Sequence, residues 1–174
     1  MTALTNSTVN STPATATGPL LEAGEEISLP ATTAPFDVKA MFKTGNGVRF
    51  STIWEDFQTH FFGHTEAPMP ALTIRKYKLL RIAPDAPIIA ELGGIAKVET
   101  PLAAAFAILL RQPAGQPGLL QTSGFANIFY TKDKNGVLCA IRIGLASDGW
   151  VVDAIPVADP LAWNGKHEIF CPVA

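Results

Sequence analysis

The aromatic residues divide the sequence into two parts. All of them, ten Phe, three Trp and two Tyr, lie at or after Phe36, and the segment 1–35 has none. That segment instead carries eight Thr, three Ser and four Pro, with three Glu as its only charges. Such a composition buries too little apolar surface to offset the roughly 1–2 kcal/mol per residue that backbone ordering costs. The sequence therefore predicts a disordered Ser/Thr/Ala/Pro-rich tail over 1–35 and one globular domain over 36–174.

One part of this tail is less polar than the rest. Leu20, Leu21, Ile27 and Leu29 fall within residues 19–35, so this stretch either forms a short strand or docks on the body as a peptide. Disorder is therefore expected above all for residues 1–18. The tail has no basic side chain, which argues against an arm that binds nucleic acid.

Composition limits the classes of partner. The formal net charge is −2 and the isoelectric point is about 5.9, so global electrostatics gives no reason to expect nucleic acid or an anionic membrane. Charged residues make up only 16% of the chain, which favours an exposed apolar contact patch. The longest apolar run, 102–110, is too short to span a membrane, and the N-terminus lacks a basic and apolar secretory signal. We therefore expect a cytoplasmic protein without a membrane partner.

Two helices are predicted from caps and periodicity. In the segment 52–62, Thr52 with Glu55 resembles a capping box, Phe57 and Phe61 share one apolar face, and Gly63 is a typical terminating residue. Thr100 followed by Pro is expected to open a second helix over 102–112 that is apolar on nearly all sides and hence deeply buried. The segment 71–82 is predicted to be a strand, and 85–92 is ambiguous between helix and strand.

The last third of the chain has the pattern of consecutive hairpins. The β-rich runs 125–131, 137–144 and 150–157 are separated by Asn-Gly and Asp-Gly turns, and Asn164-Gly165 marks a third turn. This pattern predicts an antiparallel meander of three or four strands. The expected fold class is α+β, with two or three helices packed on a mainly antiparallel sheet that ends in the C-terminal β-meander.

The histidines suggest little chemistry. His60 and His64 have the i,i+4 spacing of metal ligands on a helix, with Glu66 nearby, but Gly63 should end the helix between them. A histidine at a helix end is the preferred interpretation. No nucleophile motif and no phosphate-binding glycine loop occurs, so we expect no catalytic residue, no metal and no cofactor.

The cysteines and one acid have structural interpretations. Cys139 and Cys171 are expected to be reduced core thiols, although His167 would share a strand face with Cys171. Asp153 lies inside a predicted strand, where a cross-strand partner such as Arg142 is its expected role.

A cluster of basic residues follows the predicted strand at 71–82. It has two interpretations: an edge strand protected by lysines, which is favoured, or a platform for single-stranded nucleic acid. The candidate nucleic-acid-binding residues are Arg75, Lys76, Tyr77, Lys78 and Arg81.

The hypothesis that best fits these observations is a small non-enzymatic binding or assembly module. It would act through protein–protein contact, with a protein partner or a second copy of itself. One alternative is single-stranded nucleic-acid binding through residues 75–81. The other is a small hydrolase or metalloenzyme that uses the scarce histidines His60, His64 or His167.

Overall fold

A mixed seven-stranded sheet forms the centre of the molecule. The structure, a computed structural model, describes residues 18–173. The strands of this sheet lie in the order β1-β5-β11-β7-β8-β9-β3. Their bounds are β1 Leu21–Leu29, β3 Phe50–Ile53, β5 Leu72–Leu79, β7 Asn127–Lys132, β8 Leu138–Ala146, β9 Gly149–Pro156 and β11 Glu168–Pro172. Within the described residues, β11 with β7 and β3 with β9 are the parallel neighbours, and the other pairs are antiparallel.

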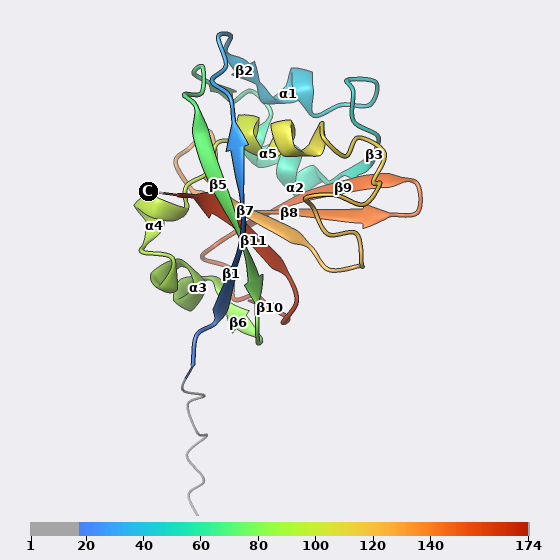
Figure 1. The fold of residues 1–174 in the computed structure, drawn as a ribbon. Helices are drawn as coiled ribbons and strands as arrows, with labels where there is room; N and C mark the ends of the chain where they lie inside the picture. The colour runs from blue at the N-terminus through green and yellow to red at the C-terminus, as the bar shows by residue number, and fades with distance from the viewer. Residues whose placement is uncertain (1–17, 174) are drawn as a thin grey trace, which may run out of the picture.

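Short helices cover both faces of this sheet (Figure 1). Their bounds are α1 Val38–Met41, α2 Glu55–Phe61, α3 Asp85–Glu91, α4 Ile95–Val98 and α5 Leu102–Leu109. Two strand pairs lie outside the sheet: β2 Phe36–Asp37 with β4 Thr65–Glu66, and β6 Ala83–Pro84 with β10 Ala162–Trp163. Among residues 18–173, no helix is long and apolar enough to cross a membrane.

The sheet separates two hydrophobic cores. Alternate side chains of a strand point to opposite faces, so Phe129 of β7 joins a core with α1, α2 and α5, whereas Ile128 and Tyr130 join a core with α3 and α4. The central strand β7 is therefore buried on both faces. The α+β prediction holds in its coarse form, but the helices are more numerous than predicted and pack on both faces of the sheet.

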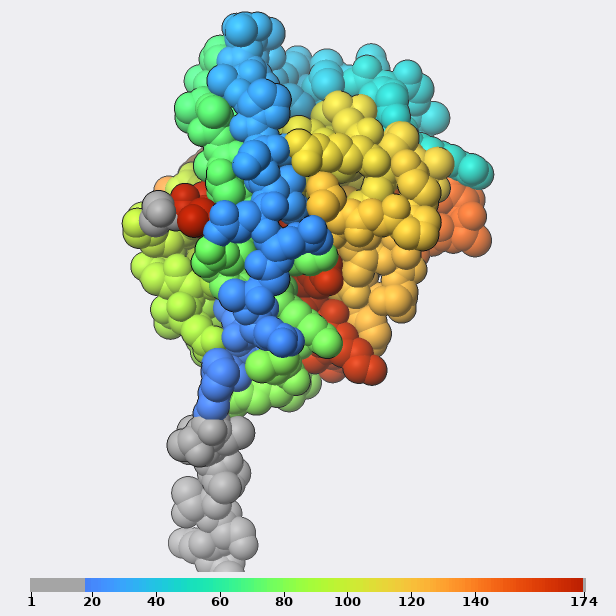
Figure 2. All heavy atoms as spheres, in the orientation of Figure 1, coloured from blue at the N-terminus to red at the C-terminus, as the bar shows by residue number. Residues whose placement is uncertain are grey.

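The segment Leu21–Leu29 is a strand rather than part of a disordered tail. It pairs with β5 along its length, with Leu21 opposite Leu79 and Leu29 opposite Leu72. Figure 2 shows this segment running along the surface of the body. Of the two alternatives for residues 19–35, the strand is the one that the structure shows, so the predicted boundary at residue 35 lies too far along the chain. Residues 1–17 of the predicted tail lie outside the described residues.

The predicted start of the helix over 52–62 was wrong, although the helix itself was right. Thr52 lies in β3, and α2 begins only after Trp54, which makes no side-chain cap. The predicted core residues Phe57 and Phe61 are fully buried, and Gly63 has a positive φ of 89° where the helix ends. The ambiguous segment 85–92 contains α3.

The meander has three strands. β7, β8 and β9 pair consecutively, as the Asn-Gly and Asp-Gly turns predicted. The fourth predicted strand does not join them at the Asn164-Gly165 turn, because β10 pairs with β6, and β11 lies between β5 and β7. The indole N–H of Trp163 in β10 donates to Asp85 at 2.7 Å, which fixes β10 beside α3.

Candidate functional site

A cleft of about 650 Å³ opens between β4, α4 and the β7–β8 turn. One wall is the loop 67–70, with Ala67, Pro68, Met69 and Pro70. The N–H of Met69 donates to Thr32 Oγ1, and its carbonyl accepts from the N–H of Thr32, both at 2.8 Å. The two prolines and the two hydrogen bonds to Thr32 restrain this loop in the absence of a ligand. This restraint lowers the entropy cost of binding.

Glu66 lines this cleft and caps the start of α5. Its two carboxylate oxygens accept from the N–H groups of Leu102 at 2.7 Å and Ala103 at 2.8 Å. These N–H groups have no partner within the helix, and the helix dipole favours a negative charge there. Burial raises the pKa of Glu66, and the two backbone hydrogen bonds oppose that rise. Thr100 was predicted to make this cap, but its hydroxyl donates to the carbonyl of Val98 at 3.0 Å.

The cleft carries an excess of negative charge. Three carboxylates line it, those of Glu66, Glu99 and Asp133, against Lys132 and His64. Lys132 Nζ pairs with Glu99 at 2.7 Å, and both side chains are more than a third exposed, so this pair contributes little to stability. The arrangement favours a ligand that combines an apolar stem with a positive charge.

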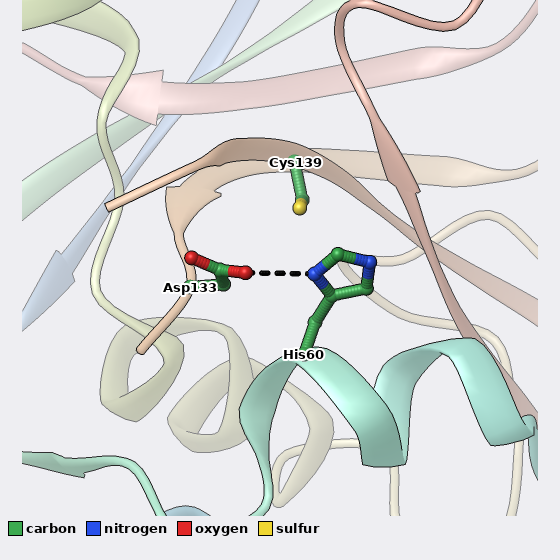
Figure 3. Close-up of side chains that lie close together, drawn as sticks. All are labelled: His60, Asp133 and Cys139. Carbon is green, nitrogen blue, oxygen red and sulfur yellow. Dashed lines mark hydrogen bonds and ion pairs between the residues drawn. The ribbon is translucent and has the colours of Figure 1, made fainter. Parts of the chain in front are cut away.

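A second group of polar side chains lies beneath the β7–β8 turn (Figure 3). His60 Nδ1 and Asp133 Oδ2 are 2.7 Å apart, and the ligand atoms of His60, Asp133 and Cys139 all lie within 4.8 Å of one another. We call these three residues the His60–Asp133–Cys139 cluster. It joins the C-terminal turn of α2 to the first hairpin of the meander.

Asp133 is fixed by the turn that contains it. Its Oδ1 accepts from the N–H groups of Asn135 and Val137, both at 2.8 Å, so Oδ2 is directed toward His60. Burial acts to raise the pKa of Asp133, but the hydrogen bonds from His60 and from the two N–H groups outweigh it and lower the pKa.

The two thiols are buried and protonated at neutral pH. Cys139 Sγ donates to the carbonyl of Val137 at 3.7 Å, and burial raises the pKa of the Cys139 thiol to about 12. Burial likewise raises the pKa of Cys171 to about 11. Because the thiolate is the nucleophile, neither cysteine is arranged for nucleophilic catalysis.

The basic residues of β5 lie beside acids. Arg75 forms an ion pair with Glu26, and Lys76 Nζ is 2.8 Å from Glu25 and 3.8 Å from Glu168. β5 lies between β1 and β11, so its interpretation as an edge strand was wrong.

The other three candidate nucleic-acid-binding residues, Tyr77, Lys78 and Arg81, lie in different surroundings. Tyr77 is half-buried against the second core, and an Arg81 guanidinium N–H donates to the carbonyl of Gly18 at 2.8 Å. Lys78 is exposed and stands opposite Glu22 of β1 and Glu168 of β11. Four of the five candidates thus lie on β5, where Arg75 and Lys76 are paired with glutamates, and Arg81 lies just beyond the end of this strand.

The alternative of a His60–His64 metal pair, which the sequence did not favour, is not formed in the described residues. His60 turns to Asp133, and His64 lies in the cleft beyond Gly63. His167 accepts from the N–H of Ala126 at 2.8 Å, and its ring packs between Phe125 and Trp163.

Asp153 lies where the cross-strand interpretation puts it. Its Cα is the register partner of Arg142 on the neighbouring strand β8. Its carboxylate also accepts from the N–H of Ala154 at 2.9 Å.

Asp85 is a buried acid that the sequence analysis missed. It is 2% exposed, and its Oδ1 accepts from the Tyr130 hydroxyl at 2.6 Å and from the Trp163 indole N–H at 2.7 Å. Within the described residues, its Oδ2 has no hydrogen-bond partner. Burial raises the pKa of Asp85 against the effect of both hydrogen bonds.

The contact of Glu66 with the start of α5 and that of Asp133 with His60 were not predicted either. For Asp133, the Lys-Asp-Lys-Asn-Gly turn offered a signal, because an aspartate at a turn commonly accepts from N–H groups ahead of it. For Glu66, 36 residues separate the carboxylate from the N–H of Leu102, and no local pattern encodes such a contact. In comparisons with known proteins, no family model, no curated protein and no solved structure matches the chain.

Proposed function

We propose that this protein is a non-enzymatic binding module whose cleft takes a basic side chain from a protein partner. The observation that carries the proposal is the cleft of about 650 Å³, with a rigid apolar wall on one side and three carboxylates around it. A concave site with a few convergent polar groups is the usual form of a ligand site. The buried, protonated thiols favour binding over thiol catalysis.

A protein ligand fits the surroundings of the cleft better than an isolated small molecule. Val137 is 42% exposed and follows the lining residue Gly136, and Ile95 is 52% exposed and precedes the lining residue Ala96. We infer that these neighbours of lining residues add exposed apolar surface near the cleft. A lysine or arginine in the cleft, with apolar neighbours on the rim, is the ligand that this surface accommodates.

The methionine methyl groups offer a direct test. The chain contains Met1, Met41 and Met69, and Met69 lines the cleft whereas Met41 packs beside the first core. With the methyl groups labelled with carbon-13, titration with N-acetyl-lysine methylamide is expected to shift the Met69 signal saturably and leave Met41 unchanged. N-acetyl-norleucine methylamide, which has an apolar stem without the charge, should bind more weakly.

A variant separates the charge from the shape of the cleft. Glu99→Gln removes one carboxylate from the rim and should weaken the lysine probe by roughly three- to tenfold at low salt, with little effect on the norleucine probe. The proposal fails if Met69 does not respond to the lysine probe, or if N-acetyl-glutamate methylamide shifts it equally well.

A second candidate function is nucleic-acid binding, which one observation favours. Lys78, Lys166 and Phe125 line a hollow of about 480 Å³, and Lys166 Nζ lies 5.5 Å from the centre of the Phe125 ring. Basic side chains beside an aromatic ring suit single-stranded nucleic acid. Glu168 also lines this hollow, which weakens its attraction for phosphate.

Binding of labelled oligothymidylate tests this second candidate function. Binding that falls steeply with salt and is lost in Lys78→Glu combined with Lys166→Glu is expected if the hollow binds single strands. The matched control is Lys39→Glu combined with Lys43→Glu, which has the same charge change in α1 and just after it. Equal loss in both double variants would indicate non-specific attraction and rule out this site.

A further inference from the structure

We propose that the His60–Asp133–Cys139 cluster binds a transition-metal ion of the zinc class through His60 Nδ1, Asp133 Oδ2 and Cys139 Sγ. The three atoms come from α2, the β7–β8 turn and β8, and lie within 4.8 Å of one another. They converge on one point between the elements (Figure 3). The site shares Asp133 with the cleft, but it is inferred from the cluster alone, and its test reads sulfur coordination rather than binding of a basic side chain.

The donor set selects the class of ion. Zinc binds thiolate, imidazole and carboxylate together, whereas magnesium and calcium take oxygen ligands almost alone. Ligand atoms on a tetrahedral zinc ion stand roughly 3–4 Å apart, given bonds of about 2.0–2.3 Å. The separations in the cluster need only a small adjustment to reach that geometry. One thiolate and one carboxylate also neutralise a divalent charge, which lowers the cost of burying it.

Two of the three ligands are held in place before an ion binds. Asp133 Oδ1 is held by the N–H groups of Asn135 and Val137, so Oδ2 points into the cluster, where it forms a hydrogen bond with His60 Nδ1 at 2.7 Å. Cys139 is fully buried in β8. Hydrogen bonds that orient a ligand in this way are typical of protein metal sites.

The ion reaches the cluster past the side chain of His60, which is the more exposed ligand. Its side chain is 24% exposed, against 1% for Asp133, so its ring can turn while the other two ligands stay. On binding, the hydrogen bond between His60 Nδ1 and Asp133 Oδ2 breaks and both atoms bind the ion. The Nδ1 proton passes to solvent while Nε2 takes one up, and the Cys139 thiol releases its proton to solvent, so binding releases one proton in all. Asp133 also lines the cleft, and a water from that side supplies the fourth ligand.

Cobalt is the probe that reports a sulfur ligand. We expect the full chain, stripped with a chelator under reducing conditions, to take up one equivalent of Co²⁺ with a sulfur-to-cobalt charge-transfer band, and Zn²⁺ to displace it. Cys139→Ser should abolish the band, and His60→Gln should weaken binding by more than roughly tenfold. Cys171→Ser and His167→Gln are matched controls, because they alter a second thiol and a second imidazole outside the cluster and the cleft, and both should bind as the wild type does.

Several outcomes would overturn the proposal. They are a folded wild-type chain without the charge-transfer band, a band that survives in Cys139→Ser, or unchanged affinity in His60→Gln. X-ray absorption of the zinc-loaded wild type guards against a variant that fails to fold. One sulfur among nitrogen and oxygen ligands is expected there, and a first shell without sulfur refutes the assignment.

Discussion

Replacing Gly149 by alanine is expected to lower the free energy of unfolding by about 3 kcal/mol or more, because strain and overpacking add at this position. Gly149 begins β9 with a φ of 145°. A Cβ there would lie 2.6 Å from the carbonyl oxygen of Arg49 and 3.0 Å from the nitrogen of Ser51. Both atoms belong to the backbone beside β9, which cannot move aside as a flexible side chain can.

The Gly149→Ala substitution would also weaken the pairing of β3 with β9. The N–H of Trp150 donates to the carbonyl of Arg49 at 2.9 Å, and a displaced Arg49 loses this bond. Gly45→Ala is the matched control, since Gly45 also has a positive φ of 89° but has no atom within 4 Å of the added Cβ. It should cost only the conformational strain, about 1–2 kcal/mol. Urea unfolding measures both, and equal losses would contradict the argument.

Replacing Asp85 by alanine is expected to cost about 3–5 kcal/mol, because the Tyr130 hydroxyl and the Trp163 indole N–H both lose their buried acceptor. Asp85→Asn is the matched control: its side-chain oxygen still accepts from both donors, and it should cost about 1 kcal/mol or less. Thermal and urea unfolding separate the two variants. A loss in Asp85→Asn as large as in Asp85→Ala would show that the charge, and not the acceptor, holds this core together.

The same pair of proteins gives a pH dependence with a definite sign. Burial raises the folded-state pKa of Asp85 above its unfolded value, so the folded state holds the proton to higher pH. Its contribution to stability is complete below the unfolded pKa of about 3.9 and is lost as the pH rises through the folded pKa. Wild type should therefore lose stability relative to Asp85→Asn as the pH rises from about 4 toward neutrality. A constant difference, or one of opposite sign, contradicts the raised pKa.

The local parts of the fold could be predicted from the sequence. Turns with Asn-Gly and Asp-Gly located β7, β8 and β9, and Cys139 lies in the first core, as expected for a core thiol. These predictions succeed because a turn and a strand period depend on residues next to one another in the chain.

The pairings between distant segments could not be predicted in this way. β11 lies parallel to β7 and antiparallel to β5, and a parallel neighbour leaves no turn signal between the two strands. β1 exposes most of its side chains, so its composition resembled that of a polar tail. The candidate site depends on the same long-range contacts, because Glu66 and Asp133 reach their partners across more than thirty residues.

The position of β1 changes how shortened versions of this protein should be interpreted. A chain that begins at Phe36 lacks the strand that covers β5 and the glutamates Glu25 and Glu26 that neutralise Lys76 and Arg75. Its sheet would end in an unpaired basic edge, which attracts both other strands and polyanions. Nucleic-acid binding or aggregation by such a fragment would therefore report a surface that the full chain keeps covered.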